Sequence, residues 1–334
     1  MTESSGSPLL GIEDLRIDFA TERGWTNVLN GVSFDIQKNQ IVVLVGESGS
    51  GKTVTSLSVL GLVPRAHSRK AGGHIWYGGR DLTELPVREL RDIRGNEISM
   101  IFQEPMTSLN PAFTIGDQIA EAYRRHRGGK KRAALARAAE MLDLVGIPNA
   151  GSRVRDYPHE FSGGMRQRAM IAMALICEPR LLIADEPTTA LDVTVQAQIV
   201  ELLMRLRDET GCGILFVTHD LGVVAELADK VVVMYAGEVV ETAVARDLYI
   251  RPRHPYTEGL LAAMPQQGVK GQDLPTIPGR TPDPWDMPAG CRFSPRCGHA
   301  REECRSDAIT LRPLDDGRAC RCRRCGDLTL AGVR

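Results

Sequence analysis

The sequence has no run of 18 consecutive apolar residues, the length that a helix needs to cross a bilayer. The stretch Met1 to Leu10 also lacks the basic region and apolar core of a secretion signal. A formal net charge of -1 provides no overall field that would attract nucleic acid or anionic lipid. We therefore expect a chain that stays in the cytosol and does not span a membrane by itself.

Cysteine is scarce through most of the chain and concentrated near its end, where six of the eight cysteines occur. In a reducing compartment, clustered cysteines are more typical of metal binding than of disulfide bonding. The sequence therefore predicts a metal-binding extension. The clustered residues are Cys291, Cys297, Cys304, Cys320, Cys322 and Cys325.

The composition is that of a folded protein, since 334 residues with 43% hydrophobic and 25% charged residues can bury a substantial core. Short apolar runs, typical of strands buried on both faces, alternate with helical stretches, which predicts an α/β fold with a mostly parallel sheet. The expected strands are Ile41–Val45, Leu181–Ala184, Ile214–Val217 and Val231–Tyr235. The expected helices are Lys52–Leu62, Lys131–Leu144, Met165–Cys177 and Val195–Glu209.

Other segments differ from this core in their pattern of apolar and polar residues. Leu15–Phe19 and Val28–Ile36 alternate openly between apolar and polar residues, which predicts antiparallel strands beside the main sheet. The stretch from residue 104 to 178 is mainly helical, which predicts a helical subdomain inserted between two parts of the core. Those two parts are expected at residues 8–103 and 179–250.

Proline recurs between Arg251 and Pro288, which excludes long helices and central strands there. We therefore expect residues 251–334 to form an extended linker followed by the cysteine-rich extension.

The most specific motif follows the first buried strand and opens a helix, as a phosphate-binding loop does. Its glycines let backbone N–H groups surround phosphates. Lys52 would contact the β and γ phosphates, and the Thr53 hydroxyl would bind Mg2+. The motif consists of Gly46, Glu47, Ser48, Gly49, Ser50, Gly51, Lys52 and Thr53.

Two further features are ambiguous when taken singly. Asp185 and Glu186 end an apolar strand, a pattern more often found at an ordinary strand exit. With a phosphate loop in the same chain, Asp185 is expected to help hold Mg2+ and Glu186 to polarise the attacking water. Ser162-Gly163-Gly164 begins a helix, which predicts either a simple N-cap or a second anion-binding site.

These motifs, in this order, resemble those of the ATP-binding-cassette ATPases over Leu10 to Leu248. The resemblance implies a phosphate-loop nucleotide-binding domain with a mostly parallel sheet, an antiparallel β subdomain and an inserted helical subdomain. It also implies that each ATP is enclosed between the phosphate loop of one subunit and the Ser162-Gly163-Gly164 segment of another, so that ATP drives dimerisation. The motifs that complete the resemblance are Gln103, Ala190-Leu191-Asp192 and His219.

The resemblance assigns roles to these additional residues. Gln103 would sense the γ phosphate, bind the Mg2+ ion and link both to the helical subdomain. Asp192 would lie at the dimer interface, and His219 would hold the γ phosphate and the attacking water. The adenine is expected to stack on Phe19 or Trp25, of which Phe19 is favoured.

Longer stretches resemble the ATPase subunits of oligopeptide, dipeptide and nickel importers. These are Phe102 to Pro111, Tyr157 to Arg168, Asp192 to Gln198 and His254 to Thr257. Phe161 and Met165 stand where the general signature most often has Leu and Gln, which is typical of the first of two ATPases in such importers. The resemblance therefore implies a heterodimer with a related ATPase, two membrane-spanning permeases and an extracytoplasmic binding protein, with this subunit peripheral at the cytoplasmic face of the membrane.

The stretch Gly290 to Cys297 resembles the C-terminal extension of peptide-importer ATPases, in which four cysteines hold a 4Fe-4S cluster. The resemblance assigns this cluster to Cys291, Cys297, Cys304 and Cys320, with Cys322 or Cys325 able to replace the last. Zinc is the alternative metal. Neighbouring arginines, among them Arg296, are expected to stabilise the thiolates.

Two other function classes are less well supported. A soluble cassette ATPase acting on nucleic acid would need aromatic residues among the arginines of the tail, where only Phe293 is present. An export ATPase is disfavoured by the importer-like stretches. The sequence does not distinguish dipeptides, longer peptides and nickel chelates as cargo.

Overall fold

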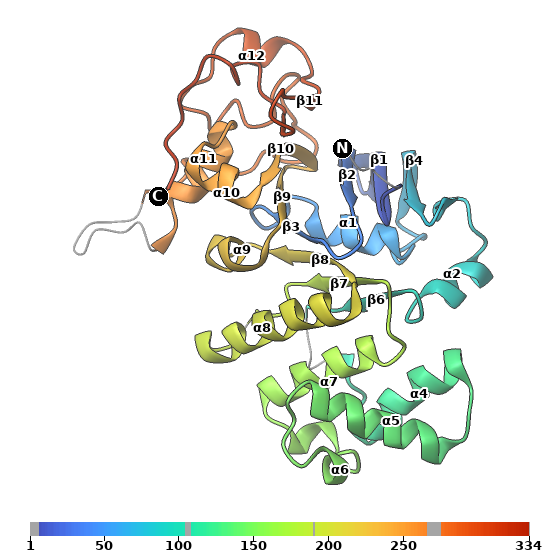
Figure 1. The fold of residues 1–334 in the computed structure, drawn as a ribbon. Coiled ribbons are helices and arrows are strands. Elements are labelled where there is room, and N and C mark those ends of the chain that lie inside the picture. Colours follow the sequence, from blue (N-terminus) through green and yellow to red (C-terminus); the bar gives the residue numbers. More distant parts are fainter. Residues whose placement is uncertain (1–6, 104–107, 190, 266–274, 334) are drawn as a thin grey trace, which may run out of the picture. The chain divides into compact units, whose positions relative to one another are not determined.

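The computed structural model describes residues 7–103, 108–189, 191–265 and 275–333 (Figure 1). The chain divides into two compact units, which are described separately. The first comprises Met1–Ile36, Ile41–Thr83 and Thr218–Arg334, and the second Gln37–Gln40 and Glu84–Val217. The domain boundaries predicted from the sequence stay a prediction.

One sheet of the first unit is antiparallel, with strand order β2-β1-β4-β5. It consists of β1 (Leu10–Thr21), β2 (Gly24–Ile36), β4 (Ser68–Tyr77) and β5 (Arg80–Asp81). Leu10 pairs with Ile36 and Thr21 with Gly24, so β1 and β2 form a long hairpin. The hairpin confirms the antiparallel strands expected in this region.

The second sheet of this unit carries the phosphate-loop sequence at the end of β3. Strand β3 (Ile41–Val45) runs parallel to β9 (Lys230–Tyr235), and β9 pairs antiparallel with β10 (Glu238–Val244). All five residues of β3 are buried, which explains its uninterrupted apolar sequence. The helices of this unit are α1 (Lys52–Val59), α9 (Leu221–Leu227), α10 (Ala245–Ile250), α11 (Pro255–Ala262) and α12 (Glu303–Ser306).

The C-terminal extension continues this sheet through two short strands. Strand β12 (Ala319–Cys320) pairs with β10, and β11 (Arg312–Pro313) pairs with β12. The proline-rich segment is less extended than expected because it contains α11. Pro255 stands in the first turn, where a missing N–H costs little, and the His254 side chain accepts a hydrogen bond from the Tyr256 N–H at 3.1 Å.

The second unit contains three parallel strands in the order β8-β7-β6 (Figure 1). They are β6 (Ile98–Ile101), β7 (Leu181–Asp185) and β8 (Gly213–Thr218), and every residue in them is buried. This burial confirms the strands predicted from apolar runs.

A group of helices separates β6 from β7 in the sequence, as the helical pattern of this stretch predicted. Helices α4, α5 and α7 pack against one another. No helix in the described parts of the chain is long and apolar enough to cross a membrane. The helices of this unit are α2 (Val87–Ile93), α4 (Ile115–Arg127), α5 (Lys131–Leu144), α6 (Ala150–Arg153), the 3-10 turn η1 (Pro158–Glu160), α7 (Gly163–Leu175) and α8 (Val193–Thr210).

Candidate active site

The loop between β3 and α1 folds around the side chain of Lys52, which is only 5% exposed. Its Nζ donates hydrogen bonds to the carbonyl oxygens of Gly46 at 2.8 Å and Glu47 at 3.1 Å. The ammonium group thus lies inside the curve of the loop. Phosphate oxygens can replace these carbonyls as its acceptors, because an ammonium donates to both kinds of oxygen.

Two glycines allow the loop to pass close to β9 and β10. A Cβ atom at Gly46 would lie 2.2 Å from the Met234 carbonyl oxygen, so no larger residue fits there. Gly51 has a φ of 101°, a conformation that side chains disfavour. The Gly237 N–H donates a 2.9 Å hydrogen bond to the Ser50 carbonyl and braces the loop from the same side.

The remaining loop residues differ in exposure. Ser48 and Gly49 are exposed at the tip, and Thr53 is exposed in the first turn of α1. The Ser50 hydroxyl is buried, and within the described residues it has no hydrogen-bond partner. A buried hydroxyl without a partner is costly in a folded protein, so it marks a position where a ligand oxygen would be favourable.

In the second unit, the end of β7 places two carboxylates with different environments. Asp185 is 2% exposed, whereas Glu186 is partly exposed and has a φ of 47°, which is unusual for a residue with a side chain. The Glu186 N–H donates to the Val217 carbonyl at 3.0 Å, which holds this conformation against β8. Strained backbone of this kind is concentrated at functional sites.

The carboxylate of Glu186 accepts two side-chain hydrogen bonds at its Oε2 atom. Gln103 Nε2 donates at 3.1 Å and Thr189 Oγ1 at 2.9 Å. The structure therefore brings together Gln103 and Glu186, which are far apart in the sequence. Glu104 to Thr107, which follow Gln103 in the importer-like stretch, lie outside the described residues, as does Ala190.

Two helix N-termini in this unit are capped by side chains, of which the sequence predicted the cap at Ser162. The Ser162 hydroxyl accepts a 3.3 Å hydrogen bond from the Met165 N–H, and Asp192 Oδ1 accepts one of 3.0 Å from the Val195 N–H. A Cβ atom at Gly163 would contact nothing within 4 Å, whereas one at Gly164 would lie 3.1 Å from Val195 Cγ1. The first glycine is therefore open to a ligand, and the second is required for packing against α8.

The other predicted site residues belong to the first unit. His219 follows β8 and is exposed. On the β1–β2 hairpin, Phe19 is partly buried, and Trp25 is 50% exposed with the Arg69 guanidinium 4.3 Å above its ring. Both aromatic candidates for adenine stacking thus stay open.

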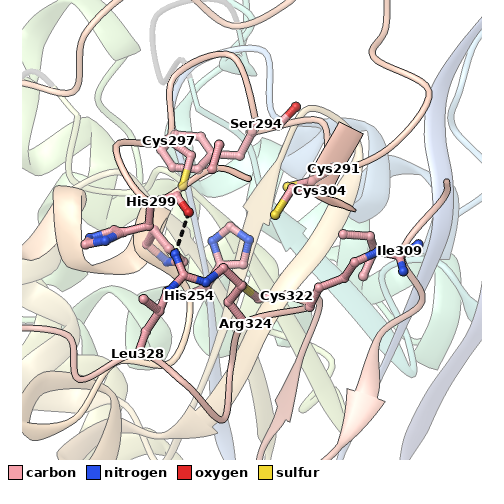
Figure 2. Close-up of a pocket in the computed structure, with 14 residues that line it drawn as sticks. His254, Cys291, Ser294, Cys297, His299, Cys304, Ile309, Cys322, Arg324 and Leu328 are labelled. Carbon is pink, nitrogen blue, oxygen red and sulfur yellow. Dashed lines mark hydrogen bonds between the residues drawn. The ribbon is translucent and has the colours of Figure 1, made fainter. Parts of the chain in front are cut away.

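The cysteines of the extension differ in whether they line a cavity. Cys291, Cys297, Cys304 and Cys322 line one small cavity together with His254 and His299 (Figure 2). Cys320 and Cys325 do not line it but pack against Cys322, and the Cys320 thiol lies 3.5 Å from the Arg253 carbonyl oxygen. The structure thus places Cys322, not Cys320, beside the other three cysteines of the expected set.

Two of the cavity cysteines lie in an environment that disfavours the thiolate. Burial raises the pKa of Cys291 to about 12 and that of Cys322 to about 11, because a thiolate there loses hydration. Among the described residues, no group of three or more His, Cys, Asp or Glu side chains has the arrangement of a metal site. Four cysteines on one cavity nevertheless match the donor set of Zn2+ or an iron-sulfur cluster.

The arginines of the extension do not all serve the cysteines. The sequence pattern assigned Arg296 to stabilise thiolates, but its guanidinium forms a paired contact with Glu47, with Nη1–Oε2 at 2.6 Å and Nη2–Oε1 at 3.0 Å. Sequence reasoning missed this contact because the two residues are 249 positions apart. The one feature of the sequence that could have indicated this contact was Glu47, an acidic residue inside a phosphate-binding motif.

Comparison with known proteins agrees with this geometry. The ABC transporter family matches residues 29–189, and the C-terminal region of the oligopeptide/dipeptide transporter family matches residues 240–304. A protein of Brucella abortus (strain 2308), bearing the name of a peptide import ATP-binding protein, is 51% identical over 96% of this chain and 98% of its own length. The chain belongs to the ABC transporter family.

Other relatives support the same family. The dipeptide transport ATP-binding protein DppD of Bacillus subtilis (strain 168) is 48% identical over 93% of this ABC protein and 96% of its own length. The dimeric ABC cassette MJ0796, bound to ADP and Pi after hydrolysis, has a TM-score of 0.64 and 26% identity over 71% of this chain and 99% of its own. The family and the fold predicted from the sequence are confirmed, and the chain is an ABC-type ATPase.

Proposed function

We propose that this ABC ATPase powers the import of dipeptides or oligopeptides across the cytoplasmic membrane. The match of residues 240–304 to the C-terminal region of oligopeptide/dipeptide transporters carries this proposal, because that region lies outside the general cassette. The names of the relatives from Brucella abortus and Bacillus subtilis support the same cargo class. Nickel chelates are the alternative cargo.

Nucleotide binding would start at the phosphate loop. Lys52 would transfer its hydrogen bonds from the loop carbonyls to the β and γ phosphates of ATP, and the backbone N–H groups after Gly46 would surround the same phosphates. Ser50 supplies a buried hydroxyl that gains a partner in the process. Thr53, Asp185 and Gln103 would hold the Mg2+ ion, which offsets the charge of the phosphates.

Hydrolysis would depend on Glu186 as the group that orients and polarises water. The Gln103 amide and the Thr189 hydroxyl fix its carboxylate by hydrogen bonds, which restricts the carboxylate to one orientation. Because the side chain is partly exposed, a water molecule can reach it. We assign His219 to contact the γ phosphate, since polar residues after a parallel strand commonly line the ligand site of an α/β sheet.

The Ser162-Gly163-Gly164 helix start would bind the γ phosphate of the ATP held by another subunit. Helix α7 is 13 residues long, so it offers a full set of N-terminal N–H groups and a helix dipole. Asp192 would lie at the same interface. We propose that the partner is a second, related ATPase and that the pair docks on two permeases at the cytoplasmic face of the membrane.

We further propose that the cysteine cavity holds a metal centre that stabilises the extension. Cys291, Cys297, Cys304 and Cys322 would be its ligands, as a 4Fe-4S cluster or as zinc. The high pKa values of Cys291 and Cys322 are consistent with this role, because a bound metal would provide the positive charge that thiolates lack there.

Transport in a reconstituted system tests the proposed function. The chain would be assembled with two permeases, a second ATPase and a binding protein of the proposed importer, in vesicles that contain ATP. We expect dipeptide uptake that stops when Lys52 is replaced by Ala. Uptake of nickel without peptide would redirect the cargo assignment, and uptake independent of ATP would refute the function.

A further inference from the structure

The C-terminal extension contacts the phosphate loop directly through a buried ion pair. The side chain of Arg296 is 5% exposed, and that of Glu47 is 30% exposed. The Thr281 hydroxyl donates a further hydrogen bond of 3.2 Å to the same carboxylate. Glu47 is thereby held by two residues that lie far outside the cassette motifs.

The guanidinium of Arg296 is itself fixed on every side. Its Nε donates to the Pro278 carbonyl at 2.9 Å, and the rings of Tyr235 and Phe293 lie 5.7 and 6.0 Å from its central carbon atom. A planar guanidinium held this rigidly loses little conformational entropy when its two Nη atoms bind a carboxylate. The contact between Arg296 and Glu47 is therefore fixed by the surrounding residues, unlike an ion pair between two mobile surface side chains.

The loop backbone at Glu47 is fixed by the same aromatic cluster. The Glu47 N–H donates a 2.9 Å hydrogen bond to the Tyr256 hydroxyl, and Tyr256 is fully buried against Tyr235 and Phe293. On the adjoining side, Arg292 donates to the Ala236 carbonyl, beside the Gly237 that braces Ser50. Arg296 thus contacts the loop itself, and Arg292 contacts the turn that braces the loop.

A carboxylate in this loop is unfavourable for a site that binds a triphosphate. Like charges at short range repel, and a free carboxylate at Glu47 could also attract the Lys52 ammonium, which lies 3.1 Å from the Glu47 carbonyl oxygen. Arg296 offsets this charge and directs the carboxylate toward the extension. Lys52 then stays available for the phosphates.

We propose that Arg296 is a positioning residue for ATP binding, which neutralises Glu47 and holds the phosphate loop open to the triphosphate. The proposal rests on the proposed nucleotide site and adds a function to the extension, whose Arg296 directly precedes Cys297. It concerns affinity rather than the hydrolytic step, since the side chain that Arg296 binds is Glu47 of the phosphate loop.

Equilibrium binding of ATP and steady-state ATP hydrolysis by the full-length chain in the assembled importer test the proposal. Arg296→Met should raise the Kd and KM for ATP about tenfold with little change in kcat, which corresponds to about 1.4 kcal/mol. Arg296→Lys keeps the charge without the fork, so it should cause a smaller rise. Arg301→Met, at an exposed position of the same extension, is the control and should bind ATP like the wild type.

The deciding variant is Glu47→Gln combined with Arg296→Met, because it removes both charges. Its Kd should return to within about threefold of the wild-type value, which a purely structural role of Arg296 would not allow. Wild-type affinity in Arg296→Met, or no recovery in the double variant, would overturn the proposal. If Arg296→Met does not fold, wild-type affinity in Arg296→Lys overturns it, and failure of the wild type itself to bind ATP overturns the nucleotide site as well.

Discussion

Gln103 donates a 3.1 Å hydrogen bond to the carboxylate of Glu186. Gln103 follows β6 and Glu186 follows β7, and the parallel pairing of these strands brings their carboxyl ends to the same edge. A residue adjoining the helical subdomain therefore touches the carboxylate that we assign to catalysis. This contact provides a direct route by which movement of the subdomain can alter hydrolysis.

Glu186→Gln should abolish ATP turnover while leaving ATP bound. The amide keeps the size of the side chain but polarises water poorly, so we expect kcat to fall by about 10²- to 10³-fold. Phosphate release and retention of labelled ATP would measure the two effects. Glu201→Gln, on the exposed face of α8, is the matched control, and normal turnover by the Glu186 variant would remove that residue from its assigned role.

Lys52→Ala should weaken nucleotide binding because it removes the charge enclosed by the loop. A charged hydrogen bond contributes about 1.5–3 kcal/mol, so we expect a rise in the Kd for ATP of about 10- to 100-fold. Titration with a fluorescent ATP analogue checks this value. The exposed Lys38→Ala serves as the control, and equal affinity in both variants would contradict the assignment.

Gly163→Ala should make the chain more stable but weaken its ATP-dependent association with the partner subunit. The position is helical and has open space around it, so alanine should stabilise the chain by up to about 1 kcal/mol through its helix propensity. The same methyl group would obstruct the ATP of the partner subunit and weaken ATP-dependent association. Gly151→Ala, also open and helical, should leave association intact, and an unimpaired Gly163 variant would exclude the proposed contact.

Cys322→Ser and Cys320→Ser should differ in metal content. Cys322 lines the cavity with three other cysteines, whereas Cys320 does not line it and packs against Cys322 and Cys325. Anaerobic purification followed by metal analysis should give about four iron atoms per chain in the wild type and in Cys320→Ser, and loss of iron in Cys322→Ser. Loss confined to Cys320→Ser would show that the ligand set is different, and stoichiometric zinc would identify the other metal.

The burial of His254 should make stability fall in mild acid. Burial lowers the pKa of this imidazole from 6.5 to about 3, so the unfolded chain takes up the proton first as the pH drops. The neutral imidazole contributes its full share to the free energy of unfolding above pH 6.5. Below that pH the free energy of unfolding decreases, by about 2 kcal/mol at pH 5. Urea unfolding measured at pH 5 and above pH 6.5 should show this loss of stability. His254→Asn, which can still cap α11, should lose less stability between the same pH values.

The core of the fold was predictable because buried parallel strands have continuous apolar sequences. Ile41–Val45 emerges in the structure with the bounds predicted, and the helix over Lys131–Leu144 does so as well. Both depend on local pattern, namely β-branched residues in the strand and repeated alanine and leucine in the helix. The predicted cap formed by Ser162 is local too.

Features that depend on distant contacts were not predictable. The spacing of the cysteines does not reveal that Cys320 pairs with β10 at Glu241, which removes its side chain from the cavity. Helix α11 was missed because its prolines indicate a break unless one of them stands in the first turn. The role of Arg296 could not be inferred from neighbouring cysteines, since its partner is in the phosphate loop.

The association of this chain with the second ATPase that we propose as its partner, measured in ATP and in ADP, tests the central claim most directly. Sedimentation of the Glu186→Gln chain, mixed with the equivalent variant of the second ATPase, would report the dimer. We predict a stable pair with ATP and separate subunits with ADP, because only the triphosphate joins Lys52 to the Gly163 segment of the neighbouring subunit. Equal association in both nucleotides would contradict the account.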